Sequence, residues 1–112
     1  MSSHEEAHLR ILKIVGAEPD ISQRQLAVRL GVSLGKTNFL VKALLEKGLI
    51  KAANFRRAEN KLKYAYLLTP KGIGEKVRMT RAYLARKEAE YEALQAEIRA
   101  LKREVAATDE LH

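Results

Sequence analysis

Two short helical segments meet at a three-residue turn in the first half of this 112-residue chain. The run QRQLAVRL follows Ser22, a good N-cap whose capping-box partner is Gln25, and it stops at Gly31, a residue type suited to the left-handed position after a helix. Two residues further on, Ser33 caps the run LGKTNFLVKALLEK, which stops at Gly48. Such a short connection between two helices predicts a helix-turn-helix.

The segments around this unit predict a domain that is mainly α-helical with a small β-hairpin. Helical spacing of apolar residues runs from Glu5 to Val15, and Asp20–Ser22 is compatible with a very short strand. LIKAA (residues 49–53) and YAYLL (residues 64–68) are strand-like and enclose the polar, basic stretch NFRRAENKLK. A helix-turn-helix followed by such a hairpin is a winged helix-turn-helix.

One long helix is predicted for the C-terminal part of the chain. Thr69 and Pro70 form an N-cap followed by proline at the first helical position, and no helix breaker occurs from Glu75 to Ala107. Apolar residues recur there at alternating spacings of four and three, which is the heptad seam of a coiled coil. We therefore expect a DNA-binding domain in residues 1–70 and a dimerisation helix in residues 71–112. The predicted dimer interface consists of Val77, Leu84, Tyr91, Leu94, Ile98, Leu101 and Val105.

The heptad positions also predict how two such helices pair. In a parallel pair, Glu97 at a g position meets Lys102 of the second copy, whereas an antiparallel pair sets g-position glutamates against one another. Lys87 and Thr80 occupy d positions and weaken the middle of the seam. The heptads therefore predict a parallel two-stranded coil that is tightest from Tyr91 to Val105.

The charge of the chain is unevenly distributed. The net charge is +7; residues 33–64 hold eight basic and two acidic residues, residues 71–87 hold six and one, and residues 88–112 hold three and seven. A concentrated basic region indicates a polyanionic partner, most often nucleic acid, while a solvated lysine-rich surface is the plain alternative.

Composition argues against several other classes of protein. The chain has no cysteine, which excludes disulfides and thiolate metal sites. Its polar N-terminus MSSHEEAH is unlike a signal peptide, and no apolar run approaches the length of a membrane span. We therefore expect a cytoplasmic protein without a metal or cofactor.

Two short motifs resemble catalytic sites but lack what catalysis needs. GVSLGKT (Gly31–Thr37) has one residue too few between its glycines for a phosphate-binding loop, and a helix precedes it instead of a strand. In a helix-turn-helix, Thr37 is instead expected to face the core. HEEAH (His4–His8) has the spacing of a zinc-binding pair. A metalloprotease also needs a third ligand, and the only other histidine in the sequence is His112, at the opposite terminus. His4 and His8 are therefore expected to be surface histidines on a first helical turn. The sequence therefore predicts no enzymatic activity.

The order of these elements, with the segments LLEKGLI (residues 44–50) and LTPKG (residues 68–72), resembles the MarR family of transcriptional regulators. The resemblance covers about residues 8–75 and implies a winged helix-turn-helix that binds double-stranded DNA. The segments NFRRAENKLKYAYLLTPKGI and RKEAEYEAL further resemble a group of MarR-like regulators associated with bacterial exopolysaccharide gene clusters. That likeness implies control of polysaccharide biosynthesis.

The chain departs from the larger family at its ends. Typical MarR proteins dimerise through helices at both ends, with small-molecule pockets between those helices and the winged helix. Here the N-terminal extension is minimal and one long heptad helix takes its place. The resemblance therefore assigns no small-molecule effector.

The second helix of a helix-turn-helix enters the major groove with its N-terminal residues toward the base edges. Asn38 can pair with adenine and Lys36 with guanine or phosphate, while Gly35 permits close backbone approach. Phe39 either contacts a thymine methyl or packs under the wing, and packing is favoured. The predicted DNA contacts are Gln23 and Ser33 near helix N-termini, Gly35, Lys36, Asn38, Phe39 and Lys42 on the second helix, and Asn54, Arg56, Arg57, Lys61 and Lys63 in the wing, with Arg56 or Arg57 in the minor groove.

Two other classes of function remain open. One is a winged-helix protein-interaction module, whose coiled coil recruits a partner and whose basic face is incidental. The other is RNA binding, which usually shows exposed aromatic residues on a sheet; the six aromatic residues of this chain are mostly needed for core or coil.

Overall fold

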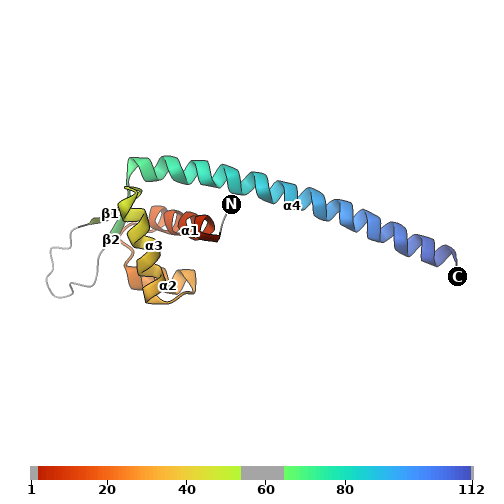
Figure 1. The fold of residues 1–112 in the computed structure, drawn as a ribbon, viewed down its shortest axis with the longest axis horizontal. Helices are drawn as coiled ribbons and strands as arrows, with labels where there is room; N and C mark the ends of the chain where they lie inside the picture. Colours follow the sequence, from red (N-terminus) through yellow and green to blue (C-terminus); the bar gives the residue numbers. More distant parts are fainter. Residues whose placement is uncertain (1–2, 54–64, 112) are drawn as a thin grey trace. The chain divides into compact units, whose positions relative to one another are not determined.

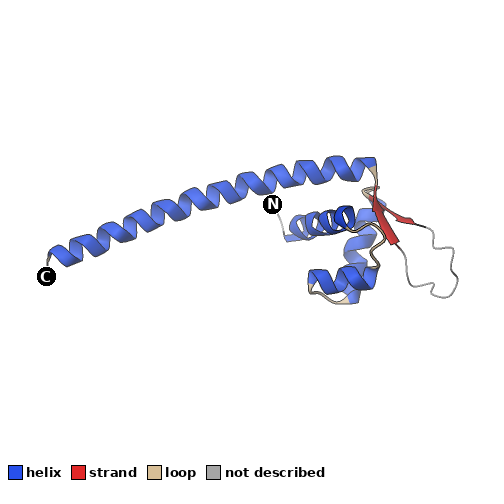
Figure 2. Ribbon diagram, turned by 180° about the vertical axis from the view of Figure 1, so that it is seen from behind, coloured by secondary structure: helices blue, strands red, loops and turns tan. Residues whose placement is uncertain are grey.

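The computed structural model describes residues 3–53 and 65–111. In chain order its elements are α1 (Ser3–Ala17), α2 (Gln23–Leu30), α3 (Leu34–Glu46), β1 (Ile50–Ala53), β2 (Ala65–Leu68) and α4 (Pro70–Glu110) (Figure 1). Helices dominate the described residues, and their sheet is a two-stranded antiparallel hairpin (Figure 2). The predicted fold class, a mainly helical winged helix-turn-helix followed by a long C-terminal helix, is confirmed.

The first three helices enclose one apolar core. Its fully buried side chains include Ile11 and Leu12 from α1, Leu26 from α2, and Leu40 and Leu44 from α3. Burying one such side chain contributes roughly 1.5–3 kcal/mol. An eight-residue helix such as α2 is not stable alone, so this shared core is what holds α2 and α3 in place.

Local hydrogen bonds and left-handed glycines fix where α2 and α3 begin and end. The Ser22 hydroxyl accepts from the Gln25 N–H (3.1 Å), and the Gln25 Oε1 accepts from the Ser22 N–H (2.9 Å), so the predicted capping box is confirmed. Gly31 and Gly48 both adopt the left-handed conformation, with φ of 69° and 71°. That conformation favours glycine, and it ends both helices where the sequence predicts.

The hairpin pairs Ile50 with Leu68 and Ala52 with Tyr66. Ile50 and Tyr66 are buried against the helices, as the alternation of a half-buried strand predicts. The hairpin tip falls in residues 54–64, outside the described residues. The prediction of a short strand at Asp20–Ser22 is wrong, because Asp20 adopts a left-handed φ of 72° that an extended strand does not allow.

The junction between the hairpin and α4 explains the segment LTPKG. The Thr69 hydroxyl accepts from the Gly72 N–H (3.0 Å) as an N-cap and donates to the Gly48 carbonyl (2.5 Å). A Cβ atom at Gly72 would lie 1.9 Å from the carbonyl oxygen of Leu49. Glycine therefore allows α4 to begin directly against the backbone that follows α3.

Contacts divide the chain into two units, Met1–Thr80 and Arg81–His112. The first unit includes the opening turns of α4, in which Gly72 and Met79 are buried. As predicted, α4 continues without a break through Ala107, and it is 41 residues long. Across residues 3–53 and 65–111, no helix combines the length and the apolar character needed to cross a membrane.

Candidate nucleic-acid interface

The N-terminal turn of α3 is fixed by Ser33. Its side chain accepts a hydrogen bond from the Lys36 N–H at 3.0 Å, as expected for the N-cap. Ser33 is exposed, and a hydroxyl that accepts one bond keeps its own proton to donate. The residue therefore sets the start of α3 and presents a donor beside the positive end of the helix.

One side of α3 anchors the helix in the core. Thr37 is fully buried, and its hydroxyl donates to the Ser33 carbonyl at 2.9 Å. The prediction that Thr37 faces the core is confirmed. A buried threonine that is bonded to its own helix does not reach a metal-bound nucleotide, so the GKT tripeptide belongs to a helix start.

The opposite side of α3 carries the predicted base-reading residues. Gly35, Lys36, Asn38, Phe39 and Lys42 are all exposed. At 3.6 residues per turn, four of these form one ridge opposite the buried stripe, and Lys36 lies at its flank. A Cβ at Gly35 would meet no described residue within 4 Å, so packing within residues 3–53 and 65–111 does not require glycine there. The missing side chain leaves room for another molecule to approach the backbone.

Phe39 belongs to this ridge and also lies close to the first helix. Its side chain is 59% exposed, and its ring meets the ring of His4 edge-on, with centroids 6.1 Å apart. The described structure thus places Phe39 beside the first turn of α1. Packing of Phe39 under the wing involves residues outside the described ranges and stays a prediction.

His8 departs from the expectation of two surface histidines. It is 8% exposed and packs on the core side of α1, with its ring centroid 6.4 Å from that of His4. Burial lowers the pKa of His8, and the positive charges of Lys47 and His4 lower it further. The ring is therefore a neutral packing element. Among the described residues no three metal-ligating side chains cluster.

Gln23 makes contacts that the sequence does not predict. Its Oε1 accepts from the hydroxyl of Tyr66 (3.2 Å), and its Nε2 points to the Leu34 carbonyl (3.5 Å). The side chain thus bridges the start of α2, the strand β2 and the first residue of α3. Tyr66 is absent from the predicted site, although the alternation of YAYLL is a signal that places it inward. A phosphate contact by Gln23 stays a prediction.

The predicted wing contacts lie in the segment between β1 and β2. Asn54, Arg56, Arg57, Lys61 and Lys63 all lie outside the described residues. The strands that carry this segment are described, and Tyr66 ties β2 to Gln23. The base of the wing is therefore joined to the start of α3 by a hydrogen-bonded path.

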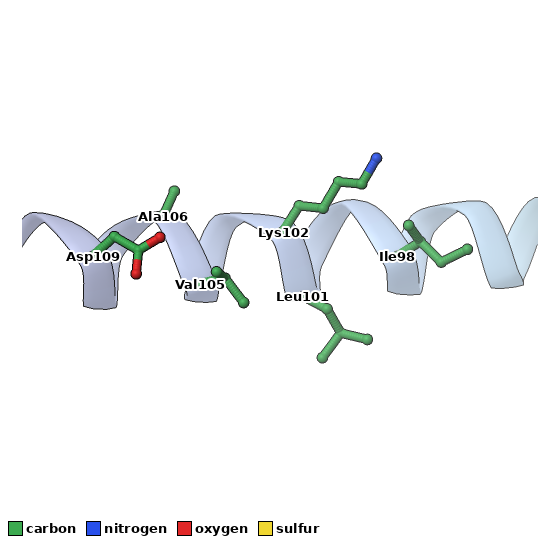
Figure 3. A pocket seen from close by; sticks show the side chains of 6 residues that line it. All are labelled: Ile98, Leu101, Lys102, Val105, Ala106 and Asp109. Atoms are coloured by element: carbon green, nitrogen blue, oxygen red, sulfur yellow. The ribbon is translucent and has the colours of Figure 1, made fainter.

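A second surface lies along α4. The seven residues of the predicted dimer seam are between 43% and 61% exposed: Val77, Leu84, Tyr91, Leu94, Ile98, Leu101 and Val105. Near the end of the helix, the exposed side chains of Ile98, Leu101 and Val105 lie close to those of Lys102 and Asp109 (Figure 3). Thr80 and Lys87 interrupt this stripe, and exposed apolar residues that recur on one helix face favour an interaction site.

Comparisons with known proteins agree with this architecture. Residues 5–51 match a family model described as winged helix-turn-helix DNA-binding. No curated protein matches the chain significantly. The family model covers less than half of the chain, so the remaining residues are compared through the fold alone.

Several solved structures share that fold. Staphylococcus aureus MarR in complex with salicylate and kanamycin aligns with a TM-score of 0.59 and 22% identity, over 77% of this chain and 55% of that one. A MarR transcriptional regulator from Methanosarcina mazei aligns at 0.66 and 21%, over 77% and 60%. Streptococcus pneumoniae FabT in complex with DNA aligns at 0.58 and 21%, over 94% and 76%.

The present chain therefore spans little more than half the length of the first two of these structures. The exposed ridge of α3 and the hairpin after it have the positions that the winged helix-turn-helix fold gives them. The chain is thus a winged helix-turn-helix protein that shares its fold with regulators of the MarR family.

Proposed function

We propose that this chain is a sequence-specific, DNA-binding transcriptional regulator that acts in the cytoplasm as a dimer and has no enzymatic activity. The observation that carries the proposal is the division of α3 into two sides. Thr37 and its apolar neighbours fix the helix in the core, while Lys36, Asn38 and Lys42 are exposed on a helix whose first turn Ser33 caps. This arrangement presents base-reading side chains on a rigid support.

The residues divide into two kinds of contact. Asn38 reads an adenine edge, and Lys36 reads guanine or binds phosphate, because their donors and acceptors match those edges. Ser33 and Lys42 contribute phosphate contacts, and the basic residues of the wing follow the DNA backbone, with Arg56 or Arg57 in the minor groove. One structural neighbour, FabT, is in complex with DNA, which supports DNA binding by this fold.

The dimer is formed through the exposed seam of α4. A dimer presents two copies of α3 to the two halves of a pseudo-palindromic site, and binding both halves multiplies affinity. The finer assignment, control of polysaccharide biosynthesis genes, rests on the resemblance of the wing and the start of the coil to the exopolysaccharide-associated group.

The test is a gel shift with the DNA upstream of the operon that encodes this protein, against a scrambled duplex of equal length. We expect a preference for the upstream DNA and a linear loss of log affinity with log salt, at a slope of about −0.9 for each phosphate contact. Equal binding to both duplexes, or no binding, refutes the proposal. If the chain does not bind DNA but captures another protein from a lysate of the same cells, it is instead a winged-helix protein-interaction module.

A further inference from the structure

We propose that α4 pairs with α4 of a second copy of this chain in the antiparallel orientation, centred on Ala89, with Lys87 opposite Tyr91 of the other copy. The proposal deepens the dimer of the proposed function and depends on that dimer. It reverses the parallel orientation that the contact between Glu97 and Lys102 alone predicts.

The first argument is the charge along α4. Both charge blocks lie on one continuous helix: residues 71–87 hold six basic and one acidic residue, and residues 88–112 hold three basic and seven acidic residues. A parallel pair lays basic beside basic and acidic beside acidic. An antiparallel pair lays each basic block beside the acidic block of the other copy, so the overall electrostatic interaction is attractive.

The second argument is the extent of the apolar stripe. The stripe extends from the second unit into the first. Ile73 and Val77 belong to the first unit, and they are 54% and 47% exposed. An antiparallel pair centred on Ala89 gives every seam residue from Ile73 to Val105 a seam residue opposite it. The matched layers are Ile73 with Val105, Val77 with Leu101, Thr80 with Ile98, Leu84 with Leu94, and Lys87 with Tyr91.

Lys87 selects both the orientation and the register. In a parallel coil each d position faces its own copy, so two ammonium groups share one layer. In the centred antiparallel pair Lys87 faces the ring of Tyr91, and a slip by one heptad places it against Leu84 or Ile98 instead. Within one chain, the Lys87 ammonium already lies 5.2 Å from the centroid of the Tyr83 ring. An aromatic ring is thus a favourable neighbour for this cation, and a second lysine is not.

The flanking charges agree with the centred antiparallel pair. It brings Lys76 of each copy to Glu104 of the other, because g positions face g positions in this orientation. It also sets Glu88 and Glu90 each against its own copy at the centre. The Glu90 carboxylate, however, already accepts hydrogen bonds at 3.1 Å from two cations of its own chain, one turn earlier. These cations are Arg86 and Lys87, so the repulsion at the centre is reduced, and the same ion pair also reduces the repulsion between two Lys87 ammonium groups in a parallel layer.

The parallel alternative has more like-charged contacts at its edges. Its one kind of attractive pair is Glu97 with Lys102 of the other copy. Its two kinds of repulsive pair are Lys76 with Arg81 and Glu104 with Asp109. Each exposed pair contributes little by itself, so the preference comes from the sum of the edges, the Lys87 layer and the two charge blocks.

A spin-label distance tests the orientation without altering the seam. The chain has no cysteine, so Arg103→Cys, at an exposed f position, introduces one labelling site. In the antiparallel pair the two labels are separated along the axis by about 42 Å, at 1.5 Å per residue from the centre, whereas a parallel pair holds them within about 25 Å, across two helix widths. A distance above about 40 Å is the result expected from this rise per residue. The shorter distance overturns the proposal, and so does a monomeric chain, which would assign the seam to a different protein.

Cross-linking provides an independent check of the register. Leu84→Cys and Leu94→Cys are prepared separately, mixed in denaturant, refolded together and bridged by oxidation or a short bis-maleimide. The antiparallel pair gives a covalent dimer in the mixture and none in either variant alone. Cross-links within the single variants, or none in any sample, contradict it. Neither experiment contains DNA, so an antiparallel dimer that fails to bind DNA would refute the proposed function and leave the pairing intact.

Discussion

Two glycines in the first turn and a half of α4 should respond to alanine in opposite directions. Gly72 is buried, and a Cβ there would lie 1.9 Å from the Leu49 carbonyl oxygen and 2.9 Å from its carbon. Gly74 is exposed, and a Cβ there would meet nothing within 4 Å. Gly72 and Gly74 lie two residues apart in the same helix, so each alanine variant is a control for the other.

The expected magnitudes follow from these distances. Real Cβ contacts are essentially never shorter than 3.0 Å, so in Gly72→Ala the backbone at Leu49 must retreat by more than about 1 Å. That movement strains the Thr69 bonds to Gly48 and to Leu49, at 2.5 and 3.1 Å. Overpacking of this kind costs about 1–3 kcal/mol, and each hydrogen bond contributes about 0.5–1.5 kcal/mol. After a gain of about 1 kcal/mol in helix propensity, a net loss of about 1–5 kcal/mol remains.

Gly74→Ala has the propensity gain without the collision, so it should stabilise the protein by about 0.8–1 kcal/mol. Thermal unfolding followed by circular dichroism measures both changes, and about 1 kcal/mol shifts the midpoint by roughly 4–8 °C in a domain of this size. Hydrogen exchange of the β1 amides locates the effect of Gly72→Ala at the hairpin. Midpoints that move in the same direction in the two variants would refute the conclusion that Gly72 is needed for the close approach of α4 to the Leu49 backbone.

Three further predictions concern the interface and its support. Asn38→Ala should cost about 1–3 kcal/mol of binding free energy on the specific site and relax the preference at one base position. Arg56→Ala should weaken binding to all DNA and reduce the salt slope by about 1. Binding titrations at several salt concentrations measure both effects. Gly35→Ala should keep or raise the free energy of unfolding by up to about 1 kcal/mol and still weaken specific binding, since no described residue fills that space. The pKa of His8 in the folded chain lies below its unfolded value of 6.5, so the neutral ring contributes stability above pH 6.5 that is lost as pH falls through 6.5 toward the folded pKa. In urea unfolding from pH 8 to 5, His8→Gln should lose less stability than the parent chain.

The elements with strong local signals could be predicted from the sequence. Ser22, Gly31 and Gly48 act through the backbone within three residues of themselves, so their roles do not depend on the rest of the fold. The heptad helix is equally local, since each turn repeats the preceding one. Asp20 shows where this approach fails, because a left-handed residue at a non-glycine position leaves no signature in the pattern.

The contacts between distant segments could not be predicted. Gln23 is polar and stands at a helix start, which makes a phosphate contact reasonable, but the hydroxyl that occupies its Oε1 comes from Tyr66, 43 residues later. His8 has the same spacing pattern as a surface histidine, and only the packing of α1 shows that it is buried. Such roles depend on which segments meet, and the order of elements does not specify this at the level of atoms.

The comparison of Gly35 with Gly72 distinguishes residues that the fold needs from residues that it leaves free for other uses. Gly72 is explained entirely by the Leu49 backbone, and no ligand needs to be invoked for it. Gly35 lies in a helix, where glycine costs about 0.5–1 kcal/mol relative to alanine, and nothing in the described structure uses the space it leaves. The exposed neighbours Lys36, Asn38 and Lys42 likewise contribute nothing to the core. When packing, capping and hairpin geometry are accounted for, the residues of α3 without a structural task converge on one face, and DNA recognition is the task that best fits their chemistry.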